Sequence, residues 1–320
     1  MLSEPDFQQK QIIFIQIEEY KELAFKFSND NLVVYSEGKI KNKLSLHKIL
    51  SIFVIGSFTV TSNLVEKCIS FGISIFLLRN NLEVYAEIES SAKGNYLLRH
   101  QQYNLDDRAE LAIAKQIVIN KTLNQFLVLK KLGYPTHPLE PVTLKEQIET
   151  AIGYQVLLGI EGEASKYYFE HIFNPYNWYG RRPRTKSDIN NLLLDIGYTY
   201  LFHFVDSILR LYGFDTYKGV YHKLFFQRKS LACDLMEIFR PVIDYTLIKA
   251  WHLNQINEAD FVFKNPNFEL PWKHNQQYSS IFLTAILDIK LEIFEYIRDY
   301  YRFFMNPTDN SMPVYKSKIR

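Results

Sequence analysis

The sequence predicts an α+β protein in which a small N-terminal β-rich domain is followed by a larger, all-helical domain. The first ninety residues contain short apolar runs rich in Ile, Val, Phe and Tyr, which is typical of strands. Beyond residue 95 the apolar positions recur every three or four residues, which indicates amphipathic helices. The chain has 320 residues, 47% of them apolar and 22% charged, which is enough for two globular domains.

The N-terminal β-rich domain is predicted to cover residues 1–89. Its predicted strands are KQIIFIQI, NLVVYSEGKI, ILSIFVIGSFTV, GISIFLLR and NLEVYAEIE. One helix is expected from residue 62 to residue 72, where Ser62 or Asn63 can cap the N-terminus and Glu66 suits the first turn. The small residues of SSAKGN then predict a linker at 90–95.

Residues 96–305 are predicted to form the helical domain. Its first long helix ends at a C-capping Gly133 and carries an apolar stripe made of Leu111, Ala114, Ile117 and Val118. Further helices are expected within 141–173, 188–212, 230–253 and 279–304. The last segment, 306–320, contains two prolines and three basic side chains, so we expect a flexible basic tail.

Charge and cysteine content narrow the class of function. The formal net charge is only +2, so nucleic-acid affinity has to come from local clusters of basic residues. Cys68 and Cys233 lie far apart in apolar surroundings, which predicts buried, reduced thiols. The N-terminus lacks the apolar core of a signal peptide, and no apolar run approaches the ~18 residues of a membrane span. We therefore expect a soluble, cytoplasmic protein.

Two acids lie among apolar residues in the stretch SLACDLMEIF. Asp234 and Glu237 are three residues apart, so they share one helix face and can direct two oxygens at one point. Burying a charge costs several kcal/mol unless a partner compensates it. These carboxylates therefore require a partner, and the sequence favours a bound metal ion in that role.

A third acid, Glu161, is flanked by Gly159 and Gly162 in a predicted helix. Because glycine costs about 1 kcal/mol relative to alanine in a helix interior, we expect the two glycines to permit a close backbone approach at a crowded site. The alternative is that Glu161 is an ordinary solvated side chain at a helix crossing.

His222 is surrounded by basic residues, with no acid between Thr216 and Lys229. Neighbouring cations disfavour protonation, which leaves a neutral imidazole that can bind a metal, although a lone histidine is more often structural. One histidine, one glutamate and an Asp/Glu pair together predict an oxygen-rich site for a hard divalent cation, Mg²⁺ or Mn²⁺.

Two basic segments suit phosphate groups, and Trp178 and Tyr179 add stacking surface to the first of them. Ser187 is the predicted N-cap of the helix that follows this first loop. A merely solvated loop is the alternative interpretation of its composition. The candidate DNA-binding residues of the two segments are Arg181, Arg182, Arg184, Lys186, Lys223, Arg228 and Lys229.

Four motifs occur in one order along the chain: GIEGEASKYYF, GRRPRTKSDINNLLLDIGY, KGVYHK and SLACDLMEIFRP. This ordered set resembles the signature of the CRISPR-associated integrase-nuclease family, the "Cas-one" proteins of spacer acquisition. The resemblance covers nearly the whole chain, including the β-rich first ninety residues. It implies that the helical domain is a metal-dependent catalytic domain.

By that resemblance, Glu161, His222 and Glu237 would be the catalytic residues and metal ligands, with Asp234 as a near neighbour. Asn191 falls on the asparagine of the family's basic-loop motif, and we expect it to support the site. The departures are mild: Tyr221 stands where leucine is commoner, and the loop before the helix has an extra basic residue that could alter DNA preference.

The resemblance also implies the reaction and the partners. The family's proteins are homodimers that assemble with a small ferredoxin-like partner into a heterohexamer and hold a short DNA duplex. They join its 3′-hydroxyl ends to the CRISPR repeat by metal-dependent phosphodiester transesterification, with endonuclease activity as the reverse or hydrolytic reaction. We expect the dimer to form through the β-rich domain, since a ninety-residue domain covers its apolar strands only partly.

Two other functions are compatible with the residues. One is a non-catalytic nucleic-acid-binding scaffold that buries its acids as structural ion pairs. The other is a metal-dependent phosphohydrolase of small molecules, which would more naturally carry adjacent His and Asp residues. Substitution of Glu161 or Glu237 separates the scaffold from the enzyme, because a scaffold functions without them.

Overall fold

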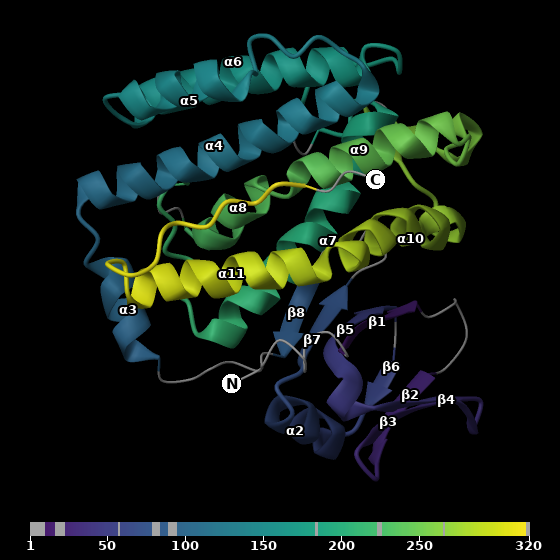
Figure 1. The fold of residues 1–320 in the computed structure, drawn as a ribbon. Helices are drawn as coiled ribbons and strands as arrows, with labels where there is room; N and C mark the ends of the chain where they lie inside the picture. The colour runs from purple at the N-terminus through teal and green to yellow at the C-terminus, as the bar shows by residue number, and fades with distance from the viewer. Residues whose placement is uncertain are drawn as a thin grey trace. The chain divides into compact units, whose positions relative to one another are not determined.

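The computed structural model describes residues 10–16, 23–56, 58–78, 84–88, 95–182, 185–222, 226–264 and 266–317 (Figure 1). The chain divides into two compact units, Met1–Asn95 with Arg210–Gly213 and Tyr96–Leu209 with Phe214–Arg320. The division after Asn95 falls at the end of the expected linker, whose other residues lie outside the described part of the chain. The inclusion of 210–213 in the first unit is not evident from the sequence pattern.

The described residues of the first unit form two four-stranded sheets, with strand orders β1-β5-β7-β8 and β4-β3-β2-β6. In the first sheet, β1, β5 and β7 are parallel and β8 is antiparallel to β7. The strands are β1 (Gln11–Gln16), β2 (Leu23–Ser28), β3 (Asn31–Ser36), β4 (Lys39–Ser45), β5 (Ile49–Ile55), β6 (Phe58–Val60), β7 (Ser74–Leu78) and β8 (Val84–Ile88).

Each predicted segment contains strand residues, but two of the predicted strands are each two strands. ILSIFVIGSFTV contains β5 and β6, which belong to different sheets. The predicted strand NLVVYSEGKI is a hairpin of β3 and β4, because Glu37 and Gly38 both have positive φ angles (52° and 74°) and form a two-residue turn. Strand β2 was not predicted, although Phe25 and Phe27 alternate with polar residues at the spacing of a half-buried strand.

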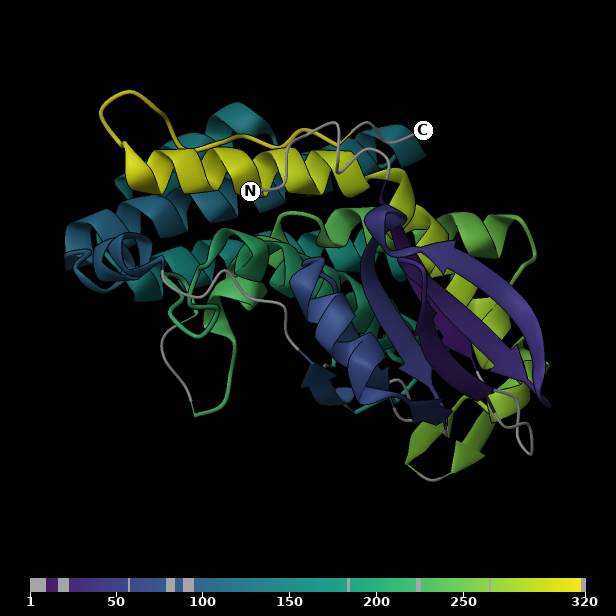
Figure 2. The ribbon, with the colours of Figure 1, turned by 90° about the horizontal axis from the view of Figure 1, so that it is seen from below.

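Helix α2 (Ser62–Ser70) completes the core of the first unit (Figure 2). Its N-cap is Thr61, which accepts a hydrogen bond from the backbone N–H of Leu64, and not Ser62 or Asn63 as predicted. Leu64 and Cys68 are buried in the core, and burial raises the pKa of the Cys68 thiol to about 11. Cys68 is therefore a protonated core residue, as predicted. Cys233 is only half-buried.

Within its described residues, the second unit contains helices and one short antiparallel hairpin, β9 (Val262–Lys264) with β10 (Asn267–Glu269), so the prediction of an all-helical domain was wrong in this detail. Its helices are α3 (Tyr96–Tyr103), α4 (Asp107–Leu132), α5 (Pro141–Thr150), α6 (Tyr154–Phe173), α7 (Ile189–Tyr212), α8 (Ser230–Glu237), α9 (Arg240–His252), α10 (Trp272–Asp288) and α11 (Lys290–Met305). Helix α4 ends at Gly133, whose left-handed φ of 74° confirms the predicted C-cap.

The segment after α11 is not a free tail up to residue 317, contrary to the prediction for 306–320. It runs back across the helices (Figure 1), and its backbone is held by two buried asparagines of α4. Asn120 accepts from the N–H of Tyr315 at 2.7 Å, and Asn124 accepts from the N–H of Ser317 at 2.7 Å and donates to the carbonyl of Tyr315 at 3.1 Å. The Tyr315 ring packs on Phe239, with 4.6 Å between centroids. Residues 318–320 lie outside the described residues.

Helix α7 is long and apolar enough to span a membrane by length and composition alone, which was not expected from the sequence. However, 83% of its apolar window is buried inside the protein, as in a core helix. Gly197 shows how closely α7 is packed, because a Cβ there would lie 2.5 Å from a methyl group of Ile243 and 2.9 Å from the Phe282 ring. By contrast, a Cβ at Gly159 or Gly162 would meet nothing within 4 Å, so the predicted close approach at these glycines is not present in the fold.

These environments predict opposite effects of the same substitution in two helices. Gly197→Ala should destabilise the protein by about 1–3 kcal/mol, the usual cost of overpacking. Gly159→Ala should stabilise it by about 0.5–1 kcal/mol, because alanine loses less backbone entropy in a helix. Thermal unfolding followed by circular dichroism should show melting temperatures that move in opposite directions from the wild type. Equal shifts of the two variants would contradict the packing described for α7.

Candidate active site

Two of the predicted site acids meet at one ammonium group. Glu161 lies on α6 and Glu237 ends α8, and both carboxylates contact Lys121 of α4. Lys121 Nζ lies 2.8 Å from Glu237 Oε2 and also contacts Glu161 Oε1, which accepts a hydrogen bond from the Ser165 hydroxyl at 2.8 Å. The fold therefore brings together two acids that are far apart in the sequence.

A proline fixes the position of Glu237. Pro241 has no N–H with which to bond the carbonyl of Glu237 four residues earlier, and its ring crowds that carbonyl. Helix α8 consequently ends at Glu237, and α9 begins at Arg240, so the predicted helical region 230–253 consists of two helices. The division places the Arg240 guanidinium 2.7 Å from Glu237 Oε1. Each oxygen of the Glu237 carboxylate thus faces its own cation.

Both acids are ionised at neutral pH despite their burial. Burial raises the pKa of Glu237, but the positive charges of Arg240 and Lys121 outweigh it and lower that pKa to about 2. Burial also opposes ionisation of Glu161, and the ammonium of Lys121 lowers its pKa below the usual value. Protein cations therefore compensate these carboxylates in the structure, whereas the sequence led us to expect a metal ion in that role.

Asp234 is fully buried and is compensated by hydrogen bonds. Its Oδ2 accepts from the N–H groups of Val220 at 2.7 Å and Tyr221 at 3.0 Å, and its Oδ1 accepts from the N–H of His222 at 2.7 Å. The loop can fold around the carboxylate because residue 219 is glycine, where a Cβ would lie 2.7 Å from Asp234 Oδ2. This close approach explains the glycine of the KGVYHK motif.

Asp234 also orients the imidazole of His222, whose Nδ1 lies 2.7 Å from Asp234 Oδ1. Since a carboxylate only accepts, Nδ1 carries the proton and donates it, which leaves Nε2 as the available lone pair. A carboxylate bonded to the second ring nitrogen is the usual support of a metal-binding histidine. His222 lies near enough to Glu237 to interact with it electrostatically. Asp234 thus positions His222.

Lys121, Arg240 and Ser165 were not predicted as site residues. Lys121 had a detectable signal, because it continues the buried stripe of Ile117 and Val118 on α4 at helical spacing, where a charged side chain is unusual. Tyr221, noted as a departure from the family pattern, is buried beside the acids. Burial and the charges of Glu161 and Glu237 raise the pKa of its hydroxyl above the usual value.

The basic loop before α7 is built around Asn191. The Asn191 side chain accepts from Arg181 Nη1 at 2.8 Å and from the N–H of Arg182 at 2.9 Å, and it donates to the Gly180 carbonyl at 2.9 Å. The N-cap of α7 is Asp188, which accepts from the N–H of Asn191 at 2.7 Å, and not the predicted Ser187. Asn191 therefore holds the described start of the loop, residues 180–182, in place.

The predicted DNA-binding residues differ in their partners and exposure. Arg181 lies 2.8 Å from Asp195, and Lys229 lies 3.1 Å from Asp206, so these two cations are paired inside the protein. Arg228 donates to the Ser230 hydroxyl at 3.2 Å. Arg182 is exposed and Lys186 is half-buried in the same loop as Arg181. Arg184 and Lys223 lie outside the described residues.

Tyr198 connects the basic loop to the acids. Its ring is contacted by the guanidinium groups of Arg181 and Arg240, which lie 5.3 and 4.7 Å from the ring centroid. Its hydroxyl donates to buried Asp244, which also accepts from Tyr168 at 3.1 Å. Burial raises the pKa of Asp244 to about 6, against the opposing effect of these hydrogen bonds. Arg181, Tyr198 and Arg240 thus link the basic loop to Glu237.

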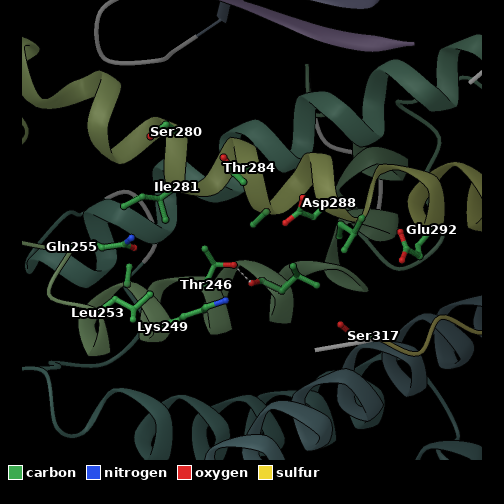
Figure 3. Close-up of a pocket in the computed structure, with 14 residues that line it drawn as sticks. Thr246, Lys249, Leu253, Gln255, Ser280, Ile281, Thr284, Asp288, Glu292 and Ser317 are labelled. Atoms are coloured by element: carbon green, nitrogen blue, oxygen red, sulfur yellow. Dashed lines mark hydrogen bonds between the residues drawn. The ribbon is translucent and has the colours of Figure 1, made fainter. Parts of the chain in front are cut away.

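A cavity of about 480 Å³ lies between α9 and α10, away from this cluster (Figure 3). Thr246 and Lys249 of α9 face Ser280, Thr284 and Asp288 of α10 across it. None of the predicted catalytic or DNA-binding residues among the described part of the chain lines this cavity. The cavity is therefore separate from the predicted catalytic residues.

The fold is that of known DNA-integration and CRISPR proteins. A casposase bound to an integration product matches it with a TM-score of 0.80 at 19% identity over 96% of this chain and 94% of that chain. A Cas1 protein from Thermotoga maritima matches with a TM-score of 0.80 at 19% identity over 96% of this chain and 100% of that chain. A chain of a Cas6-RT-Cas1–Cas2 complex matches with a TM-score of 0.77 at 24% identity, covering 98% of this chain and 36% of that chain.

Sequence comparison identifies the family. Residues 20–285 match the family model of the CRISPR associated protein Cas1. The CRISPR-associated endonuclease Cas1 1 of Thermodesulfovibrio yellowstonii is 30% identical over 251 residues, which are 73% of this chain and 79% of the relative. The endonuclease Cas1 2 of Rhodospirillum rubrum is 32% identical over 72% of this chain and 74% of the relative. The chain belongs to the Cas1 family, as its motifs predicted.

The hydrogen bonds of Asp234 predict a measurable role in orienting His222. Asp234→Asn replaces one acceptor oxygen by an amide that cannot accept from the surrounding N–H groups, so the loop and the imidazole lose their fixed position. We expect the affinity for Mn²⁺ to fall by about 10–100-fold, measured by isothermal titration calorimetry. Gly219→Ala, which crowds the same carboxylate, should act in the same direction. Wild-type Mn²⁺ affinity in both folded variants would contradict this role.

Proposed function

We propose that this Cas1-family chain is a CRISPR adaptation integrase, a metal-dependent DNA endonuclease and transesterase that joins the 3′-hydroxyl ends of short protospacer DNA to the CRISPR repeat. The observation that carries the proposal is the convergence of Glu161 and Glu237 on one cation, next to a histidine held by a buried aspartate. Family membership and the endonuclease names of the relatives support the same reaction class.

The donor atoms of the site fit a hard divalent cation. The carboxylates of Glu161 and Glu237 already converge on one positive charge, and His222 keeps Nε2 as a lone pair because Nδ1 donates to Asp234. Two carboxylates and one imidazole suit Mg²⁺ or Mn²⁺. These three residues would hold the ion. When bound, the ion would supply Lewis-acid charge at a phosphate oxygen.

The protein itself supplies ionised ligands and alignment. Arg240 and Lys121 keep Glu237 deprotonated, and Lys121 keeps Glu161 deprotonated, so no proton has to leave either acid when a cation binds. Asp234 holds His222 in one tautomer and one orientation. The attacking group is the 3′-hydroxyl of the DNA, so no covalent protein nucleophile is required, and positioning contributes much of the rate. With water as the attacking group, the same site would act as a nuclease.

The proposed partners are double-stranded DNA and other protein chains. One structural neighbour is a casposase bound to an integration product, and another is a complex that contains Cas2. For this chain we propose a cytoplasmic homodimer formed through the β-rich unit, with two dimers bridged by a small ferredoxin-like partner. Two identical sites related by a two-fold axis meet opposite DNA strands equivalently, as integration at both ends of a repeat requires.

One observation favours the scaffold alternative, in which the acids are purely structural. Lys121 and Arg240 give each oxygen of the Glu237 carboxylate a positively charged partner from the protein itself. A scaffold, however, has no use for a histidine whose ring is fixed by a buried carboxylate beside these acids. We therefore place the enzyme first, and the two functions are distinguished by the activity of site variants.

If the chain is the proposed enzyme, substitution of a metal-binding side chain should abolish strand transfer. Glu161→Gln and His222→Ala should each lower strand transfer by at least about 100-fold, the scale of losing a positioned catalytic group, while duplex binding is kept. Glu163→Gln, an exposed position two residues from Glu161 on α6, is the matched control and should keep full activity. Product formation is followed with labelled DNA on denaturing gels. Full strand-transfer activity of folded Glu161→Gln would contradict the assignment of Glu161 as a metal ligand. A wild-type protein that binds the duplex but shows no strand transfer with Mg²⁺ or Mn²⁺ would support the scaffold instead.

We predict that the basic loop before α7 contributes to DNA binding in a salt-dependent way. Arg182→Glu and Lys186→Glu should each weaken binding across sequences and reduce the slope of log affinity against log salt by about 0.9 for each phosphate that the loop no longer neutralises. Arg181→Glu should instead lower thermal stability, because it removes the ion pair with Asp195 and adds a like charge beside it. Filter binding at several salt concentrations measures the slope. An unchanged slope for Arg182→Glu and Lys186→Glu would mean that this loop is only solvated.

A further inference from the structure

We propose that Lys121 is a resident counter-cation of the metal site, which holds the position between Glu161 and Glu237 until a divalent cation displaces it. The inference rests on the proposed metal-dependent function and adds a determinant of metal affinity that the ligand motifs do not contain. The site is then a charge-exchange site whose acids are never left unpaired.

The Lys121 ammonium occupies the position between the two acids. Its Nζ contacts Glu161 and lies 2.8 Å from Glu237 Oε2, so it bridges the two carboxylates that we propose as ligands. The guanidinium of Arg240 also contacts Glu237 in the described structure, but at Oε1, the other oxygen of that acid. Of these two cations, Lys121 stands where a bridging metal ion would bind, and Arg240 stands beside it.

Charge balance favours exchange of one cation for another. The two acids contribute two negative charges, and Lys121 and Arg240 contribute two positive charges, so the group of four is neutral. A divalent cation added to that group would leave an excess of two positive charges in a poorly solvated place. Withdrawal of the Lys121 ammonium lowers this excess and frees the two carboxylate oxygens that it contacts. Arg240 can remain, because it leaves Oε2 of Glu237 open.

The lysine side chain is suited to leaving the site. Lysine presents a compact charge at the end of a flexible four-carbon stem, so its ammonium can leave the acids by rotation of the side chain. The Lys121 side chain is 9% exposed, and the hydroxyl of Ser165 remains on Glu161 when the ammonium leaves. An arginine at this position would bind both carboxylates with a rigid fork and would be harder to displace.

Displacement has a thermodynamic consequence. A ligand that must first displace a competitor binds with a lower apparent affinity, because only the fraction of sites that are already free can accept it. Removal of the Lys121 charge should therefore increase the affinity for the metal. It should also lower the stability of the metal-free protein, because one carboxylate is then left without a compensating charge. Removal of the Arg240 charge should also lower the stability of the metal-free protein. It should raise the metal affinity less than removal of the Lys121 charge does, because Arg240 does not lie between the two acids.

The test compares Lys121→Met with Arg240→Met in the full chain. Thermal unfolding is measured in EDTA and then with increasing MnCl₂, and Mn²⁺ affinity is measured directly by electron paramagnetic resonance. Both variants should melt below the wild type in EDTA. Lys121→Met should bind Mn²⁺ at least about tenfold more tightly than the wild type and gain the most stability from it, while Arg240→Met gains clearly less.

Lys121→Arg covers the case in which Lys121→Met does not fold. It keeps the positive charge and the pairing, and the inference predicts that it binds Mn²⁺ at least about tenfold more weakly than the wild type. Mn²⁺ affinity equal to the wild type in Lys121→Met, or in Lys121→Arg, would overturn the inference and leave the proposed function standing. Absence of Mn²⁺ binding to the wild-type protein would overturn the proposed function itself.

Discussion

The helical unit is organised by the requirement that two buried acids, Asp234 and Glu237, and the half-buried Glu161 be compensated. Asp234 is compensated by three backbone N–H groups and an imidazole, Glu237 by two cations, and Glu161 by one of those cations and a serine hydroxyl. The partners of the three acids come from different helices and from a loop. Together they fix α4, α6, α8, the start of α9 and the loop before α8, because an unpaired buried charge costs several kcal/mol.

The same constraint connects the site to its surroundings. Arg240 contacts both Glu237 and the Tyr198 ring, and Arg181 contacts that ring from the basic loop. The C-terminal segment packs Tyr315 on Phe239, the residue immediately before Arg240, while its backbone is bound by asparagines on either side of Lys121. Segments that the sequence presents as a loop and a tail therefore support the helices that carry the acids.

Much of this could be predicted from the sequence, because its strongest signals are local. Asp234 and Glu237 were singled out as acids among apolar residues, Glu161 by its flanking glycines and His222 by its basic surroundings, and the family motifs then combined Glu161, His222 and Glu237 into one predicted site. The partners of these acids could not be predicted in the same way. Lys121 and Arg240 reach Glu237 through tertiary packing and the helix break at Pro241. The docking of 313–317 was missed because asparagine side chains on α4, and not its own composition, hold it.

The central proposal is that Glu161, Glu237 and His222 form a single metal site, and that Lys121 holds the position between the two acids until the metal binds. A crystal structure of the protein soaked in Mn²⁺, with anomalous diffraction data, tests it most directly. We predict one anomalous peak in contact with both carboxylates and with His222 Nε2, and a Lys121 ammonium that has left the acids. No peak at saturating Mn²⁺, with Lys121 still between Glu161 and Glu237, would contradict the claim.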